Sequence, residues 1–330
     1  MGARLLCLCL LTALLGYYIY SPVPEDIAQP WTVMLASSAL RILGHLSEAA
    51  DVLGLKHYME VLRLFTDAQL VPPTSDENVT VTETEFNGVP VRLYLPRRAP
   101  GGLRRAMVYI HGGGWCLGDA GMQGYDLMAR HISNELNAVV VSTNYRLAPP
   151  HHFPAQFEDV YSVTKFFLQS KVLAQYGVDP ARVCVAGDSA GGNLAAAVAQ
   201  ELLEDPEVQT QLKAQVLIYP ALQALDLDLP SYRDNAHKPA LPPPPPSPLL
   251  ASEARLRRLP AAFVLTCEHD VLRDDGAMYV GRLRAAGVPV THHHAKDGFH
   301  GAFSFLAWPL DLALSHRLLS TCVGWLRENL

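Results

Sequence analysis

Along the first part of the chain, apolar residues recur every three to four positions. The stretches WTVMLASSALRILGHL and HYMEVLRLF, both within residues 27–70, follow this spacing, which is typical of amphipathic helices. From residue 79 the pattern alternates instead, because VTVTETEF and VPVRLYLP are separated by Asn87-Gly88, a dipeptide that favours a tight hairpin turn. The pattern therefore predicts helices followed by an antiparallel hairpin.

Beyond the hairpin, short apolar runs alternate with helix-like stretches. Buried-type strands are predicted at 106–110, 138–143, 182–186, 214–219 and 262–267. The helix-like stretches lie near 121–136, 155–175, 190–204, 274–286 and 311–329. Such alternation predicts an α/β fold with a mostly parallel central sheet flanked by helices on both faces. Ligands of this architecture bind where the strands end.

The N-terminus carries a long apolar segment. No charged residue interrupts the chain from Leu5 to Val23, a run of 19 residues, which is near the minimum for a membrane-spanning helix. A cleaved signal peptide is the alternative, but no small-residue cleavage site ends the run. We expect a transmembrane signal anchor over residues 1–23. One arginine precedes the run and two acidic residues follow it, which places the N-terminus in the cytosol and the body across the membrane.

Composition and charge narrow the class of partner. Hydrophobic residues make up 49% of the chain, charged residues 18%, and the net charge is −6, which is typical of a compact globular protein. The absence of a dense Lys/Arg run argues against a nucleic-acid partner. The sequon Asn78-Val79-Thr80 predicts N-glycosylation, which requires a secretory lumen.

The histidines and cysteines show no metal-binding spacing. In the run His292 to His294, successive strand residues point to opposite faces, so at most two of them converge. C-x-x-C pairs are missing from the sequence. We therefore expect neither a metal nor a cofactor.

The segment VCVAGDSAGGNLAAAVA at 183–199 carries the first chemical motif. Gly187-Asp188-Ser189-Ala190-Gly191 is a G-x-S-x-G sequence placed between a predicted strand and a predicted helix, as in a nucleophile elbow. Small residues on both sides of the serine allow the sharp turn that exposes its Oγ. A glycine-rich turn without chemistry is the alternative. The context favours Ser189 as a nucleophile.

A serine nucleophile needs a base that is oriented by a carboxylate, and two later segments supply candidates. TCEHDVLRDDG offers Asp270, Asp274 and Asp275, and DGFHGAFSF offers His300 in a glycine-flanked loop. Asp270 is the preferred acid because it follows a strand end, whereas the other two aspartates suit the start of a helix. The predicted order of serine, acid and histidine is that of an α/β-hydrolase.

The segment MVYIHGGGWCLGD completes the predicted site. Its glycines Gly112, Gly113 and Gly114 follow a strand and allow backbone N–H groups to approach a developing oxyanion. The N–H group of Ala190 supplies a further donor.

These motifs together resemble the hormone-sensitive-lipase-like esterases of the α/β-hydrolase fold, most closely their arylacetamide-deacetylase-like branch. The resemblance rests on HGGGW at 111–115, GDSAGGN at 187–193, STNYRLAP at 142–149, DVLRDDG at 270–276 and DGFHGAFSF at 297–305. It implies a lumen-facing, single-pass membrane protein of the endoplasmic reticulum that hydrolyses lipophilic esters and arylacetamides. It implies the same roles for Ser189, Asp270, His300 and the oxyanion donors, and a disulfide between Cys116 and Cys267.

The sequence departs from this family between PSYRDN and PLL. Relatives carry several dozen residues there, whereas this chain has only a proline tract at 239–248, which favours a polyproline II connector. We expect a helical cap over 24–78 and a catalytic domain over 79–330. A neutral lipase or cholesteryl-ester hydrolase, and a catalytically weakened binding protein, are the alternative functions.

Overall fold

The computed structural model describes residues 2–20, 23–99, 101–224, 226–235, 247–307 and 310–330. Within these residues an eight-stranded sheet has the order β1-β2-β4-β3-β5-β6-β7-β8. Its strands are β1 Val79–Phe86, β2 Val89–Pro96, β3 Arg104–Ile110, β4 Ala138–Thr143, β5 Val178–Asp188, β6 Ala214–Ile218, β7 Ala261–His269 and β8 Val290–Phe299. Strand β2 is antiparallel to β1 and β4, and the remaining pairs are parallel.

The predicted hairpin and the five predicted core strands are confirmed. Strands β1 and β2 pair with Phe86 opposite Val89, and Asn87 and Gly88 both have positive φ, 52° and 79°. This is the geometry that a two-residue hairpin turn requires. Only β1 and β2 depart from the parallel arrangement, so the prediction of a mostly parallel sheet is also confirmed.

Helices cover both faces of the sheet because alternate residues of its central strands are apolar on both sides. Ala106 and Val108 of β3 pack in one apolar cluster, and Met107 and Tyr109 pack in the other. The first cluster lies beneath α5, α7 and α10, and the second beneath α4 and α11. These helices are α4 Gln123–Leu136, α5 Ala155–Phe167, α7 Ala190–Glu201, α10 Arg273–Ala285 and α11 Ala313–Asn329.

The segment predicted as one helix at 155–175 is two helices in the structure. After α5 the chain passes through Gln169, whose ψ of 132° is extended, and then forms α6 (Ser170–Gln175). The apolar spacing continues across the break, which is why the pattern did not reveal it. The predicted helix at 190–204 ends at Glu201.

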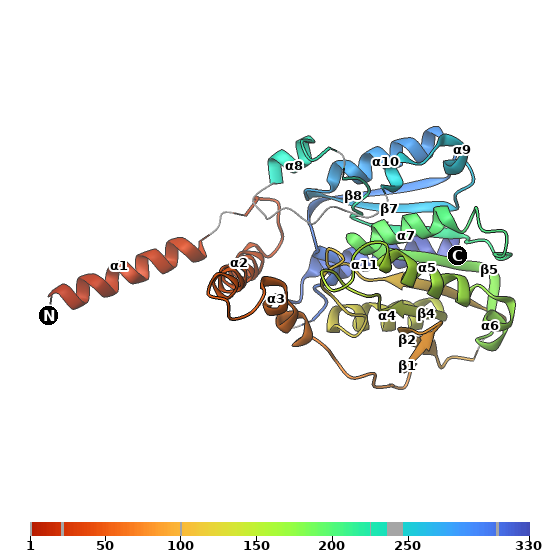
Figure 1. The fold of residues 1–330 in the computed structure, drawn as a ribbon, viewed down its shortest axis with the longest axis horizontal. Coiled ribbons are helices and arrows are strands. Elements are labelled where there is room, and N and C mark those ends of the chain that lie inside the picture. The colour runs from red at the N-terminus through yellow and green to blue at the C-terminus, as the bar shows by residue number, and fades with distance from the viewer. Residues whose placement is uncertain (1, 21–22, 100, 225, 236–246, 308–309) are drawn as a thin grey trace.

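Three helices precede the sheet. They are α1 Gly2–Ile19, α2 Pro30–Val52 and α3 Tyr58–Asp67. Figure 1 shows α1, in red, projecting away from the body, with α2 and α3 between it and the sheet. In the parts of the chain that are described, no helix combines the length and the hydropathy needed to cross a bilayer.

The predicted proline connector at 239–248 falls mostly outside the described residues, which resume at Ser247. The short elements on either side of it are α8 Pro230–Asn235, a 3₁₀ turn at Pro248–Leu250 and α9 Glu253–Leu256. Leu249 donates its N–H to the Leu222 carbonyl at 3.1 Å, and Gln200 Nε2 donates to the Pro248 carbonyl at 3.0 Å. The chain is therefore fixed to α7 and to the segment after β6 before it enters β7.

Candidate active site

The predicted site residues gather at the carboxyl edge of the sheet. Ser189 follows β5, Asp270 follows β7, and His300 follows β8. The glycine run at 112–114 follows β3, which is the neighbour of β5. Parallel strands end at the same edge, so their loops meet above it.

Ser189 occupies a sharp turn between β5 and α7. Its φ of 54° and ψ of −118° lie in a region that non-glycine residues rarely adopt, and such strain is concentrated at functional sites. A side chain at Gly187 would place Cβ 2.3 Å from the Gly191 carbonyl oxygen, and one at Gly191 would place it 2.0 Å from the Ile110 carbonyl oxygen. The two glycines therefore allow the turn to close against β3.

Ser189, His300 and Asp270 form one hydrogen-bonded chain. Ser189 Oγ lies 2.9 Å from His300 Nε2, and His300 Nδ1 lies 2.9 and 3.0 Å from the two carboxylate oxygens of Asp270. Asp270 is fully buried, and its Oδ1 also accepts the Leu272 N–H at 2.8 Å. The imidazole is thereby oriented with one nitrogen toward the serine.

The two rival aspartates have other partners. Asp274 accepts the Ser231 N–H at 2.8 Å and pairs with Arg273. Asp275 accepts the Leu222 N–H at 3.0 Å. Burial raises the pKa of Asp275 to about 6, although its hydrogen-bond donors oppose this shift. The geometry therefore brings Asp270, rather than either neighbour, to the histidine.

The glycine loop presents fewer oxyanion donors than predicted. The Gly112 N–H group points to Asp188 Oδ1 and Tyr125 Oη, both at 3.0 Å, so it is already engaged. By contrast, no oxygen of the described residues accepts from the N–H groups of Gly113, Gly114 or Ala190. The structure thus corrects the prediction for Gly112 and leaves the other three amides available.

Asp188, the variable residue of the elbow motif, was not predicted to have a role. It is 4% exposed and accepts hydrogen bonds from Tyr109 Oη at 2.9 Å and Tyr125 Oη at 3.1 Å, in addition to the Gly112 amide. Burial raises the pKa of its carboxyl, and these three donors and His300 oppose that shift. Asp188 thus ties the elbow to the glycine loop and holds Gly113 and Gly114 beside Ser189.

Tyr219 is a second residue that sequence reasoning missed. Its ring centroid lies 5.0 Å from that of His300, and its Oη accepts the Phe303 N–H at 3.3 Å. Tyr219 is buried with a φ of 34°. The only feature of the sequence that pointed to a role for Tyr219 was the position of an aromatic residue directly after β6.

The disulfide implied by the resemblance is not shown, because Cys116 and Cys267 are both free in this structure, and it stays a prediction. Cys116 lies in the loop after β3 and Cys267 lies in β7, with β5 and β6 between those two strands. The Cys116 loop also packs toward α3, where Arg63 Nε donates to the Cys116 carbonyl at 3.3 Å. Burial raises the pKa of both thiols.

The histidine run on β8 forms hydrogen bonds within the protein. His292 Nε2 and His294 Nδ1 lie 2.8 and 2.9 Å from Thr266 Oγ1, and His294 Nε2 lies 2.8 Å from Glu268. The described part of the chain contains no group of three or more His, Cys, Asp or Glu side chains placed to hold a metal ion.

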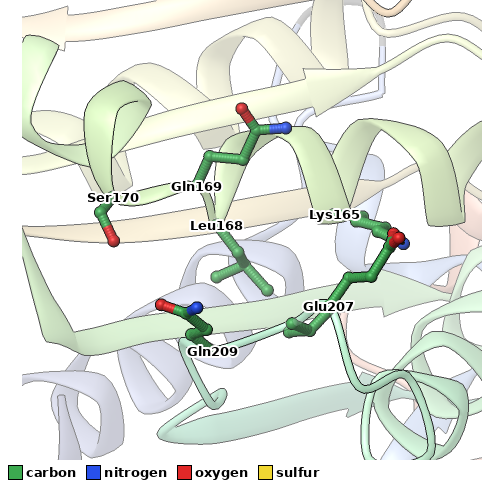
Figure 2. Close-up of a pocket in the computed structure, with 7 residues that line it drawn as sticks. Lys165, Leu168, Gln169, Ser170, Glu207 and Gln209 are labelled. Carbon is green, nitrogen blue, oxygen red and sulfur yellow. The ribbon is translucent and has the colours of Figure 1, made fainter.

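Two hollows lie at the opposite edge of the sheet from Ser189. The larger, of about 310 Å³, lies between the end of α5, the start of α6 and the loop at 207–209 before β6 (Figure 2). Lys165 at its rim pairs with Asp205 and Glu207, each at 2.6 Å. The smaller, of about 200 Å³, lies at the start of β3.

Comparisons with known proteins agree with this geometry. A family model described as an alpha/beta hydrolase fold matches residues 107–304. Arylacetamide deacetylase of Oryctolagus cuniculus is 45% identical, over 99% of this chain and 100% of that protein. Neutral cholesterol ester hydrolase 1 of Bos taurus is 36% identical over the full length of both chains.

A solved structure, the hyperthermophilic esterase from Pyrobaculum calidifontis, has a TM-score of 0.69 at 29% identity and covers 86% of this chain and 97% of its own. The alignment with the rabbit deacetylase extends over 401 positions, more than the 330 residues of this chain, so the relative has residues that this chain lacks. From these matches together, the chain belongs to the arylacetamide-deacetylase-like esterases of the α/β-hydrolase fold and is a carboxylic ester hydrolase.

Proposed function

We propose that this hydrolase cleaves lipophilic carboxylic esters and arylacetamides through Ser189, His300 and Asp270. The observation that carries the proposal is the continuous hydrogen-bonded chain from Ser189 Oγ through both ring nitrogens of His300 to the buried Asp270. A serine hydroxyl becomes a useful nucleophile when an oriented base accepts its proton. This arrangement supplies that base.

The geometry supports a two-stage mechanism. His300 Nε2 accepts the Ser189 proton as Oγ attacks the substrate carbonyl carbon, and Asp270 stabilises the resulting imidazolium. The backbone N–H groups of Gly113, Gly114 and Ala190 donate hydrogen bonds to the oxyanion of the tetrahedral intermediate. His300 then protonates the leaving alcohol or amine, which leaves an acyl group on Ser189. In the second stage, His300 takes a proton from water as the water oxygen attacks the acyl carbonyl, and it then returns that proton to Ser189 Oγ as the Oγ–acyl bond breaks and the free acid departs.

Activity-based labelling tests whether Ser189 is activated. A fluorophosphonate probe should label the wild type, and Ser189→Ala and His300→Ala should abolish both labelling and hydrolysis of p-nitrophenyl acetate. Ser170→Ala, at an exposed serine at the start of α6, is the matched control and should label as the wild type does. Circular dichroism would establish that each variant is folded. Full labelling of folded Ser189→Ala would overturn the proposal.

The substrate profile separates the arylacetamidase from its alternative. Similarity to neutral cholesterol ester hydrolase 1 favours cholesteryl esters as the second candidate class. We propose that the short connector at 239–248 removes part of the acyl-binding wall, so that acetate esters are favoured over long-chain esters. Values of kcat/KM for acetate through decanoate esters, arylacetamides and cholesteryl oleate would decide this. A steep rise with chain length would contradict the short-acyl preference.

We also propose that residues 1–23 anchor the protein in the endoplasmic reticulum membrane, with the hydrolase domain in the lumen. Leucines along α1 are strongly exposed, Leu5 and Leu11 at 64% each, and lipid would cover them. Asn78 is exposed in the segment directly before β1, which makes its side chain accessible for modification.

Two measurements test this placement. Glycosidase treatment should lower the mass of the wild type but not of Asn78→Gln, because the sequon is modified only in a secretory lumen. Alkaline carbonate should leave the full chain in the membrane pellet, and deletion of residues 1–23 should release it. An unshifted wild type, or release of the full chain by carbonate, would refute the placement.

A further inference from the structure

A cluster of arginines surrounds the smaller hollow, at the amino edge of the sheet. The hollow has a volume of about 200 Å³, and its lining includes Arg104, Arg105, Asn137 and Arg182. Arg104 and Arg105 begin β3, which runs from here to the glycine loop of the active site. Seven strand residues span about 20 Å, so this hollow is separate from the catalytic residues.

The positive charge at this hollow is not balanced by the protein. Arg182 pairs with Asp179 at 2.9 Å, and the nearby Arg327 pairs with Glu135 at 3.0 Å. Arg104 and Arg105 form no ion pair with any described carboxylate, and their guanidinium groups donate only to backbone carbonyls of Pro96, Arg98, Leu136 and Arg327. Two cations at the hollow therefore lack counter-ions.

Unpaired donors add to this imbalance. The buried Nε atoms of Arg104 and Arg105 have no acceptor within the described residues. Burial, followed by the like charges of Arg182 and Arg327, lowers the pKa of Arg105. A partly buried charge without a counter-ion costs free energy. An anion in the hollow would supply that counter-ion.

We propose that this arginine pocket binds a phosphate group. The planar guanidinium fork matches the oxygens of phosphate, and arginine is the residue most used for such recognition. A hollow of about 200 Å³ is smaller than the roughly 300–1,000 Å³ of drug-sized ligand sites, so it suits the phosphate itself, with the remainder of a larger molecule outside. Figure 1 places the C-terminus, three residues beyond Arg327, at the end of the molecule opposite α1. Because α1 is the proposed membrane anchor, the opposite end faces away from the bilayer, and inorganic phosphate or a soluble phosphate monoester fits this position. A phospholipid headgroup is the second source of phosphate to distinguish.

Thermal denaturation of the full chain in sodium phosphate and in sodium chloride of equal ionic strength tests the proposal. Phosphate should raise the melting temperature of the wild type, and isothermal titration with inorganic phosphate should give a saturable signal. Arg105→Gln should weaken phosphate binding at least tenfold, since a charge-assisted hydrogen bond contributes about that much. Arg284→Gln, at an exposed arginine on α10, is the matched control and should bind as the wild type does.

A second variant keeps the test decisive if Arg105→Gln fails to fold. Asn137 lines the hollow with a φ of 49°, a conformation that aspartate tolerates, so Asn137→Asp should supply an internal counter-ion. This variant should melt higher than the wild type in chloride and should lose its response to phosphate. Equal responses to phosphate in the wild type, Arg105→Gln and Asn137→Asp would overturn the proposal.

Vesicles distinguish the two sources of phosphate. Binding of the full chain to phosphatidylcholine vesicles sets the baseline, and vesicles that also contain phosphatidic acid provide the test. If Arg105→Gln loses only the binding that phosphatidic acid adds, while inorganic phosphate alone produces no titration signal, the bound group is a lipid headgroup. Failure in both the soluble and the vesicle measurements would refute a phosphate site.

Discussion

Replacing Asp270 by asparagine should disable the base, His300, while leaving the shape of the active site almost unchanged. In the wild type, Asp270 Oδ1 accepts the Leu272 N–H at 2.8 Å, and both carboxylate oxygens lie within 3.0 Å of His300 Nδ1. In Asp270→Asn, the amide oxygen must face the Leu272 N–H, since an NH₂ group there would oppose another donor. The NH₂ group then faces His300 Nδ1.

Because the NH₂ group takes the place of Oδ2, 3.0 Å from Nδ1, that exchange favours the other tautomer of the histidine. With a donor opposite it, Nδ1 gives up its proton and accepts, and the proton moves to Nε2, which faces Ser189 Oγ at 2.9 Å. A protonated Nε2 cannot accept the serine proton. Loss of the correct tautomer in this way lowers kcat by about 10⁴, which corresponds to roughly 5 kcal/mol of activation free energy.

The matched control is Asp274→Asn, four residues away at the start of α10. Asp274 accepts from Ser231 and pairs with Arg273 rather than with the histidine. Steady-state hydrolysis of p-nitrophenyl acetate should therefore stay near the wild-type rate in this variant and collapse in Asp270→Asn, with both proteins folded by circular dichroism. A crippled Asp274→Asn beside a mildly affected Asp270→Asn would show that the acid is wrongly assigned.

Three further changes test how the site is supported. Burial raises the pKa of Asp275 to about 6, so the native state retains this proton between about pH 4 and 6, where the unfolded chain loses it. The contribution of Asp275 to the unfolding free energy therefore falls by about 3 kcal/mol as the pH rises through that window. Urea denaturation of Asp275→Asn across this pH range should lack this fall, and the same pH dependence in the variant and the wild type would contradict it. Gly191→Ala would force Cβ to within 2.0 Å of the Ile110 carbonyl oxygen and should abolish activity or folding, while Gly281→Ala, with open space around it on α10, should be neutral or stabilising in thermal denaturation. Tyr125→Phe removes a hydroxyl that contacts both Asp188 and the Gly112 amide and should lower kcat about tenfold with the melting temperature little changed; unchanged kcat would exclude the hydroxyl from positioning the loop.

The fold could be predicted because each level of the sequence pointed to the same architecture. The spacing of apolar residues in the core strands, the Asn87-Gly88 turn and the alternation of strands with helices are all local signals. Ser189, Asp270 and His300 could be placed near one another because each follows a strand, and parallel strands end at one edge. The break between α5 and α6 at Gln169 could not be predicted, since the apolar residues continue across it and no proline or glycine marks it.

The predicted disulfide shows a different limit. Cys116 lies in the loop after β3 and Cys267 lies near the end of β7, with β5 and β6 between those two strands. The prediction came from the resemblance, which gives no distance between the two sulfur atoms. Both cysteines are free in this structure, so the disulfide stays a prediction.

Gly112 was predicted as an oxyanion donor, and the reason that its N–H group is engaged elsewhere is a residue visible in the sequence, Asp188. Asp188 ends a strand whose other late positions are apolar, and a carboxylate buried at the end of a strand must find hydrogen-bond donors. The donors available at that edge are the first free N–H group of the neighbouring loop, Gly112, and side chains beneath it such as Tyr125. An amide that satisfies a buried carboxylate cannot also stabilise a transient oxyanion. The acidic residue beside the nucleophile therefore determines which glycines of the loop remain available for catalysis, namely Gly113 and Gly114, and couples their position to the turn that carries Ser189.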